Sequence, residues 1–357
     1  MKQRFPKLLV MLALLIAMAG AVNLSSCSGD DDDEATPANK AALTAAIAAA
    51  DELLETTEEG TNDGQFPTAA RTALQGAITA AEAVVDDTAA TQTQVDAATN
   101  SLNAAMDAYD AAIVAPIAEA DLIAHYTFNE GTGTTAADIS ANALDGTLKT
   151  GPAAWGAGVP DWAADRNGDA DKALMFDDGA NIEIPYNTKL NPEQMTIALW
   201  INPAEIRESN RFIGLQSWVA YKFQLQATNR PFFTVHTSDD AYHDRDAEVE
   251  LPLNEWHHIA VTFGGGNTIF YIDGEAVKTW ENTPGTGKSI AGTPYNLVIG
   301  QDFPTDQYAP TPDNFEEDQK IPLEWGGYFH GLLDEVRMYK TVLTASQVQS
   351  IYDREKP

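Results

Sequence analysis

Hydrophobic and polar positions follow two different periods along the chain, and the period changes near residue 116. Over residues 38–115, apolar side chains recur every three or four positions, which is the spacing of amphipathic helices. Turn-forming residues interrupt this pattern at 60–67 and 86–91. The pattern predicts an antiparallel bundle of three helices. Its apolar positions are Leu43, Ile47 and Leu54, then Leu74, Ile78 and Val85, then Val95, Leu102, Met106, Tyr109 and Ile113.

Beyond residue 116 the dominant period is two, with turn signals about every ten residues. In MTIALWINP (195–203) the apolar residues Met195, Ile197, Leu199 and Ile201 share one face. The pair Asp273-Gly274 between two such runs is a strong hairpin signal. Many antiparallel strands without intervening helices predict an all-β sandwich or jelly roll.

The β region resembles a laminin-G-like (LamG) domain of the concanavalin A-like lectin/glucanase fold. The runs that carry the resemblance are HYTFNEGTGTTAADISANALDGTL, KALMFDDGANIEIP, MTIALWINP, WHHIAVTFGGGNTIFYIDGEAV, NLVIG and FHGLLDEVRMYKTVLTASQVQSIY, in family order. They place the domain at residues 120–357 and imply a packing role for Trp200. Near the end, Thr344 and Gln347 form a predicted capping box for a short helix.

Residues 38–115 are rich in alanine and carry few aromatic side chains. The stretch ATQTQVDAATNSLNAAMDAY (90–109) resembles FIVAR-type surface modules. Alanine lets helices approach closely but offers little to hold a ligand, so we expect this FIVAR-like bundle to act as a spacer. Sugar or partner binding by the bundle is the alternative.

The first 34 residues suggest export and anchoring. A basic start precedes an apolar run at residues 8–22, too short to span a membrane as a helix and typical of a signal peptide. LSSC (24–27) resembles a bacterial lipobox, which implies cleavage after residue 26 and lipid on Cys27, the single cysteine. The alternative is an ordinary secretory signal with a stray cysteine.

The acidic run at residues 30–34 follows Cys27 directly. It resembles the export signal of Bacteroidetes lipoproteins, which implies the outer face of the outer membrane. It can equally be a solvated charge run that extends a tether. We therefore expect a signal peptide at residues 1–26 and an acidic, lipid-anchored tether at residues 27–37.

The formal net charge of −32 becomes −35 once the three basic residues of the signal are removed. Such acidity makes a nucleic-acid partner, or docking on anionic headgroups, an unlikely function class. It favours bound calcium, because carboxylates are its preferred ligands.

Calcium candidates lie in two places. The loop at residues 138–146 offers oxygen ligands between turn residues, and the final predicted strand carries an aspartate among apolar neighbours. In relatives of this fold an aspartate near the final strand often holds a structural calcium; a partner such as Arg337 or backbone N–H groups is the alternative. The candidate ligands are Asp334 and, in the loop, Asp138, Asn142 and Asp145.

Retaining glucanases of this fold carry E-x-D-x-x-E on one strand, which points the acid and the nucleophile into one cleft. The acidic stretches AEVELPLNE, NFEEDQK and LLDEVRMY lack that spacing. Adjacent His257 and His258 would face opposite sides of a strand and could not chelate one metal. We therefore expect no catalysis of that kind, although carboxylates from separated loops remain an alternative.

Sugar recognition needs flat aromatic faces together with hydrogen-bonding side chains. Residues 211–245 are rich in both. Trp218 and Tyr221 flank a predicted turn, Gln224 and His236 alternate against apolar neighbours, and a polar loop follows. Trp280 and Trp325 are further loop candidates. The candidate carbohydrate-binding residues are Arg211, Trp218, Tyr221, Gln224, His236, Tyr242, His243 and Arg245.

Together these features predict a lipid-anchored surface protein whose LamG-like domain binds a polysaccharide without catalysis. A protein-binding adhesin or structural module, with other surface proteins as partners, is the alternative from another class. A glycoside hydrolase with unrecognised carboxylates is the third hypothesis.

Overall fold

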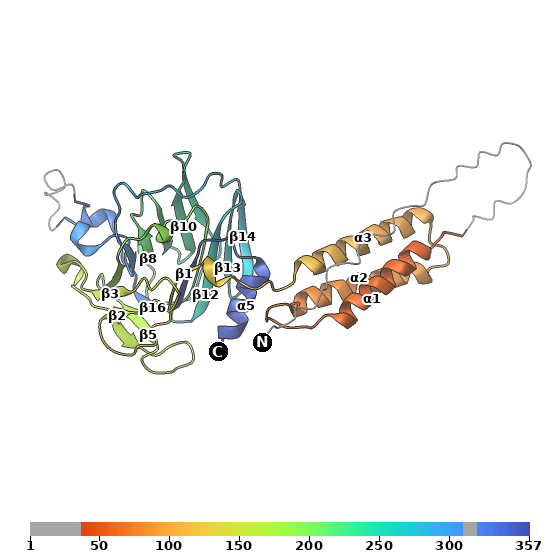
Figure 1. Cartoon of the computed structure of the whole chain (residues 1–357), viewed down its shortest axis with the longest axis horizontal. Helices are drawn as coiled ribbons and strands as arrows, with labels where there is room; N and C mark the ends of the chain where they lie inside the picture. The colour runs from red at the N-terminus through yellow and green to blue at the C-terminus, as the bar shows by residue number, and fades with distance from the viewer. Residues whose placement is uncertain (1–36, 310–319) are drawn as a thin grey trace, which may run out of the picture.

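The computed structural model describes residues 37–309 and 320–357. Cys27 and the acidic run lie outside the described residues. The described chain forms a helical bundle followed by a β-sandwich, as Figure 1 shows. This confirms the predicted fold class, a three-helix bundle before an antiparallel sandwich.

The bundle consists of α1 (Ala41–Thr56), α2 (Thr68–Asp86) and α3 (Gln92–Ala111). The helices are separated where the sequence predicted breaks. Thr91 starts α3 with a capping box to Gln94, which satisfies two backbone N–H groups at the helix end. One face of each helix is buried in a common core that includes Leu43, Leu74 and Leu102.

Two antiparallel sheets form the sandwich. The first sheet has the order β14-β13-β12-β7-β16-β5-β4, with β1 paired to β16, and the second has the order β11-β10-β9-β8-β15-β6-β3-β2. The first sheet contains β1 (Leu122–Tyr126), β4 (Asp161–Ala163), β5 (Ala173–Phe176), β7 (Met195–Pro203), β12 (His257–Gly264), β13 (Asn267–Ile272), β14 (Glu275–Glu281) and β16 (Gly331–Tyr339). The second contains β2 (Thr135–Ala136), β3 (Gly146–Lys149), β6 (Asn181–Ile184), β8 (Asn210–Leu215), β9 (Tyr221–Leu225), β10 (Pro231–His236), β11 (Tyr242–Asp246) and β15 (Leu297–Ile299).

The main core fills the space between the sheets. In β7 the alternate residues Met195, Ile197, Leu199 and Ile201 point into it, as the period-two pattern predicts. Between β13 and β14, Asp273 and Gly274 both adopt positive φ, at 51° and 82°, which is the geometry of a tight type I′ hairpin.

The outer face of the first sheet is covered by the C-terminal helix α5 (Ala345–Glu355), which Thr344 and Gln347 start with the predicted capping box. Val348 and Ile351 of α5 pack on Ala198 and Ala260 in a separate small core. Trp200 lies under the same helix and stacks on Tyr352 at 5.8 Å between ring centroids. Its packing role is therefore confirmed.

The helix α5 also contacts the end of the bundle. Gln347 Nε2 donates to the Ala115 carbonyl at 3.0 Å, and the Ser350 hydroxyl donates to the Thr61 carbonyl. One short helix thus bonds to both parts of the chain. Among the described residues, no helix is long and apolar enough to cross a membrane.

Candidate functional site

Polar side chains gather on the outer face of the second sheet, over β8, β9 and β10. Tyr221, Phe223 and Leu225 of β9 point into the core, so Lys222 and Gln224 must point outward. Arg211 of β8 lies opposite Gln224 and Thr234 of β10 lies opposite Lys222 in the strand register. We call the set Arg211, Lys222, Gln224, Thr234 and His236 the polar floor; every member is buried.

Trp218 lies above the polar floor. It belongs to the turn between β8 and β9, and 43% of its surface stays exposed. Lys222 Nζ lies 3.7 Å from the centroid of its ring, and Arg211 Cζ lies 5.4 Å from it. Cations beside an aromatic face are attracted by its quadrupole and hold the ring in place. The exposed part of the ring is an apolar surface next to hydrogen-bonding groups.

A loop after β15 closes one side of the polar floor. Asp302 in this loop is fully buried and forms an ion pair with Arg211, and it accepts hydrogen bonds from the Tyr308 hydroxyl and Gly327 N. The loop can approach because residue 214 is a glycine: a Cβ there would lie 2.4 Å from the Asp302 carbonyl oxygen. Arg211 therefore has its charge balanced and its guanidinium fixed.

The other side of the polar floor ends at His236 and Tyr242, whose rings stack at 4.0 Å between centroids. His236 Nε2 lies 3.1 Å from Asp240 Oδ1, and Lys288 Nζ reaches the same carboxylate oxygen at 2.6 Å. Tyr242 is 55% exposed. A second aromatic surface therefore borders the face, on the side opposite to the Asp302 loop.

Several polar atoms of the floor have no hydrogen-bonding partner within the described chain. They are the buried atoms Arg211 Nε, Gln224 Oε1 and His236 Nδ1. Among the described residues, the contact of Lys222 Nζ is the ring of Trp218. Burial and the nearby Arg211 lower the pKa of Lys222 to about 8. Unpaired buried polar groups are costly and point to a missing partner.

Lys222 was not among the binding residues predicted from the sequence. The sequence did contain the information needed to find it. Lys222 alternates with Tyr221 and Phe223, as Gln224 does, so both point to the same face of the strand. Trp325, a further loop candidate, is half exposed and lies beside this face, since its carbonyl accepts a hydrogen bond from Arg211 Nη1 at 2.8 Å.

Three predicted binding residues do not share this face. Tyr221 is fully buried in the core, where its hydroxyl donates to the Leu190 carbonyl at 2.7 Å. It begins β9 directly after the turn that it was predicted to flank. The prediction of a binding role is wrong because Tyr221 has the parity of the inward residues Phe223 and Leu225.

His243 and Arg245 are also misplaced by the sequence analysis. They lie opposite Val235 and Phe233, which point inward, so both face the side of the sheet that carries the core. Arg245 Cζ lies 5.3 Å from the ring centroid of Trp280 on β14, a strand of the first sheet. Five predicted residues remain together: Arg211, Trp218, Gln224, His236 and Tyr242.

The loop at residues 138–146 uses its oxygen atoms for hydrogen bonds. Asp138 accepts from the backbone N–H groups of His125, Ser140 and Leu144 at 2.8–2.9 Å. Asp145 Oδ1 accepts from Asp138 N. Asn142 Nδ2 donates to two carbonyls, and its Oδ1 accepts from Lys189 Nζ. These bonds hold the loop together without an ion, and calcium there stays a prediction.

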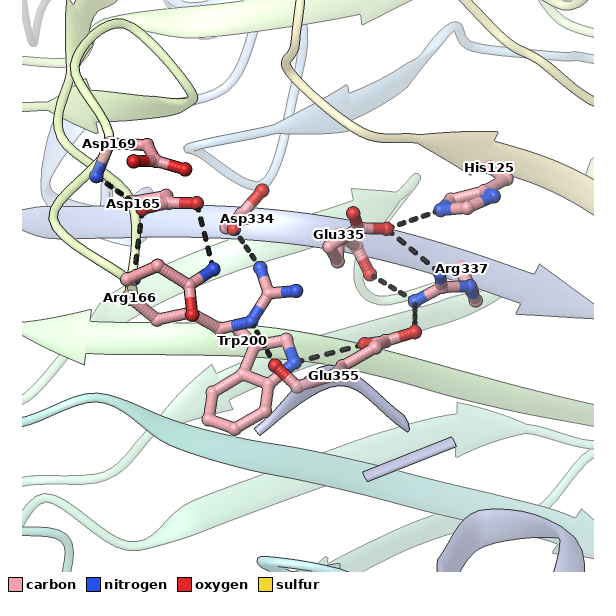
Figure 2. A network of polar contacts seen from close by, with 10 residues as sticks. His125, Asp165, Arg166, Asp169, Trp200, Asp334, Glu335, Arg337 and Glu355 are labelled. Carbon is pink, nitrogen blue, oxygen red and sulfur yellow. Dashed lines mark hydrogen bonds and ion pairs between the residues drawn. The ribbon is translucent and has the colours of Figure 1, made fainter. Parts of the chain in front are cut away.

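Asp334 lies on the outer face of the first sheet, in the network that Figure 2 shows. It is 1% exposed and pairs with Arg166 from the loop between β4 and β5. Arg166 Nε also donates to the Glu355 carbonyl at 2.6 Å, and Trp200 Nε1 donates to Glu355 Oε2 at 3.0 Å. The ion-pair partner of Asp334 is thus Arg166, which lies in the loop between β4 and β5 and was not among the predicted partners.

The same network continues through Arg337, which bridges Glu335 at 2.8 Å and Glu355 at 2.7 Å. His125 Nε2 lies 2.6 Å from Glu335 Oε2. These contacts fasten α5 to the sheet. Within the described ranges, no group of three or more His, Cys, Asp or Glu side chains is arranged to hold a metal ion. Calcium at Asp334 stays a prediction.

Comparisons with known proteins show what this chain is similar to. A family model described as the concanavalin A-like lectin/glucanases superfamily matches residues 176–315. These residues are therefore similar to that superfamily, and the match spans β6 to β15 with the polar floor. A search of curated proteins found no match.

Two solved structures are similar to part of the chain. Domain 4 of a GH43 extracellular arabinanase from Geobacillus stearothermophilus, in complex with arabinotriose, is 21% identical, with a TM-score of 0.48, over 65% of this chain and 98% of that one. The binding domain of botulinum neurotoxin DC, in complex with rat synaptotagmin II, is 11% identical, with a TM-score of 0.45, over 66% of this chain. This chain covers 52% of that neurotoxin chain, and we draw no function from these similarities.

Because the pKa of Lys222 is lowered, we expect the free energy of unfolding to rise as the pH becomes alkaline. Because the folded protein releases this proton near pH 8 and the unfolded chain only near 10.5, stability rises between these values. Lys222→Met removes the group, so the wild type should gain roughly 3 kcal/mol relative to the variant over that interval. Urea titrations at several pH values test this, and parallel curves for the two proteins would contradict it.

Burial raises the pKa of Asp334 to about 7, against the opposing effect of Arg166. Between the pKa of the unfolded chain and this raised pKa, the folded protein keeps the Asp334 proton, whereas the unfolded chain has lost it. The stabilisation that comes from the raised pKa of Asp334 is therefore complete below about pH 4 and is lost by about pH 7. Relative to Asp334→Asn, the wild type should lose about 1.4 kcal/mol per pH unit across this window. The measurement is the difference in unfolding free energy between the two proteins as a function of pH. A difference that does not change with pH would show that the pKa of Asp334 is not raised.

Proposed function

We propose that the chain is a non-catalytic carbohydrate-binding protein and that the outer face of the second sheet binds a polysaccharide. The observation that carries this proposal is the exposed ring of Trp218 above the polar floor. A pyranose ring has an apolar side that stacks on an aromatic ring, while its hydroxyls need donors and acceptors at its edge. On the same face of the sheet, Gln224 Oε1 and His236 Nδ1 have no hydrogen-bonding partner among the described residues, so they could serve sugar hydroxyls.

The contrast between the two sheets supports the choice of face. The outer face of the first sheet is filled by α5 and by the contacts of Arg166, Arg337 and Glu355. The charged groups of Arg166, Arg337 and Glu355 are paired within the protein. On the second sheet, aromatic surface stays exposed at Trp218 and Tyr242, next to unpaired polar atoms.

Binding without bond cleavage is also part of the proposal. Glycoside hydrolysis needs two carboxyl groups flanking one bond. Near the polar floor, the carboxylate of Asp302 is engaged by Arg211, Tyr308 and Gly327, and Asp240 is engaged by Lys288. These acids position other groups and are not free for acid–base work.

Trp218→Ala removes the stacking surface, and we expect its affinity for the bound polysaccharide to fall about tenfold or more, equal to about 1.4 kcal/mol. Trp218→Phe keeps a flat ring and should retain part of the affinity. The measurement is affinity electrophoresis of the full-length protein through gels that contain plant, algal or host polysaccharides. Thermal melts check that both variants fold.

Three results would contradict this proposal. Equal retardation of Trp218→Ala and wild type would move the binding site elsewhere. Absence of retardation by every polysaccharide would favour a protein-binding adhesin instead, and release of new reducing ends would favour a hydrolase.

For the location, we propose anchoring by lipid on Cys27 at the outer surface of the outer membrane, with the bundle as a spacer. Cys27 precedes the bundle in the sequence, so the anchor lies at one end of the chain and the sandwich at the other. Cys27→Ala should shift the protein from the membrane fraction to the soluble one. Cell fractionation followed by blotting measures this, and an unchanged membrane share would refute lipid anchoring.

A further inference from the structure

Among the described residues, Lys222 of the polar floor has no carboxylate in contact with its ammonium group. The guanidinium of Arg211 is paired with Asp302, and Lys288 is paired with Asp240 at 2.6 Å. Lys222 is 4% exposed, and no acidic oxygen of the described residues lies within 4 Å of its Nζ. Its contact is the ring of Trp218 at 3.7 Å.

An ammonium group in such a position lacks most of what stabilises it in water. It carries three N–H donors and no acceptor atom. The Trp218 ring attracts the charge but does not replace the oxygen acceptors of water. A buried charge is normally paired or strongly hydrogen-bonded. The natural complement is therefore a negatively charged oxygen group that arrives with the ligand.

We propose that the ligand is an acidic polysaccharide, and that a carboxylate or sulfate group on one of its sugars pairs with Lys222 while a neighbouring ring stacks on Trp218. This inference rests on the proposed function and names its substrate class. Lys222 Nζ lies over one face of the Trp218 ring, so a sugar that stacks on this ring has to use the opposite face, and the anionic group comes from the neighbouring unit.

The charges that face Lys222 come from three elements. Arg211 on β8 adds positive charge, while Asp302 in the loop after β15 and Asp244 on β11 add negative charge. Asp302 is neutralised by Arg211. Asp244 accepts a hydrogen bond from the Thr234 hydroxyl at 2.6 Å and has no cationic partner within 4 Å among the described residues. It is the residue here that would repel an acidic ligand.

The net charge of −32 also repels a polyanion at long range. Screening limits this effect, because the Debye length is about 8 Å at physiological ionic strength. A contact at Lys222 lies well within that length and is partly shielded from salt by burial. The local pair therefore decides binding near 0.15 M salt, and lower salt should weaken the initial encounter.

The test compares acidic polysaccharides with their neutral forms in affinity gels at 0.15 M salt, using the full-length protein. Polyuronates are run beside their carboxyl-reduced products, and sulfated polysaccharides beside their desulfated products. We expect retardation by at least one acidic polymer and at least tenfold weaker binding of its neutral form. Whether reduction or desulfation abolishes binding tells which anionic group is recognised.

Variants then locate the contact. Lys222→Met keeps the aliphatic stem and should lose at least tenfold in affinity for the acidic polymer. Lys356→Met is the matched control: it removes the same charge from a lysine near an aromatic ring, that of Tyr352 at 5.5 Å, but on α5. It should bind as the wild type does. Asp244→Asn keeps an acceptor for Thr234 and should bind the acidic polymer two- to threefold more tightly.

The outcomes separate the two proposals. If a neutral form binds as well as the acidic one and Lys222→Met retains its affinity, the acidic-ligand inference is wrong while carbohydrate binding stands. If neither acidic nor neutral polysaccharides retard the wild type, the proposed function fails and this inference fails with it. Equal losses in Lys222→Met and Lys356→Met would also overturn the inference, because the effect would then reflect net charge alone.

Discussion

The alternation of side chains along β8, β9 and β10 is the constraint on which the candidate site depends. Phe223 and Phe233 face each other across the strand register and both belong to the core. With these inward positions occupied, Lys222 and Gln224 have to point outward. A slip of one residue would place a lysine in the core and two aromatic rings on the surface, so burial of the aromatics fixes the register strongly. The core thus determines where the polar floor lies.

The two outer faces of the sandwich differ because one of them is closed by a helix. Arg166 and Arg337 connect β16 with the last turn of α5 through Glu355, and Trp200 packs underneath. Buried ion pairs of this kind gain little net free energy, but breaking one leaves an unpaired charge, so they favour a single docked position of the helix. Among the described residues, no α-helix covers the second sheet in this way, and its polar floor is bordered by the turn that carries Trp218 and by segments after β15.

Much of this arrangement could be predicted from the sequence because it follows from short-range patterns. The three helices, the alternation in β7, the hairpin at Asp273 and the cap at Thr344 each depend on residues within a few positions of one another. The outward positions of Gln224 and His236 were predicted for the same reason, since apolar neighbours reveal their parity.

The errors arose where that short-range information was missing or misread. The edge strand β11, with the sequence YHDRD, contains no apolar alternation, so nothing in it showed that His243 and Arg245 face inward. Tyr221 does flank a turn as predicted, but it has the parity of Phe223 and its side chain is therefore buried in the core. The pairs Arg211–Asp302 and Arg166–Asp334 join residues 91 and 168 positions apart, and only the folded chain brings them together.

The polar floor shows how a strongly acidic protein can hold a local surplus of positive charge. Arg211 is neutralised by Asp302 and the neighbouring Lys288 by Asp240, whereas Lys222 is held against the ring of Trp218, which balances no charge. Keeping this lysine buried costs stability, as its lowered pKa indicates, so a compensating role is expected. A single ion pair beside one stacked ring gives modest affinity. A polymer with many repeats, bound by many copies on one surface, turns that modest affinity into stable attachment.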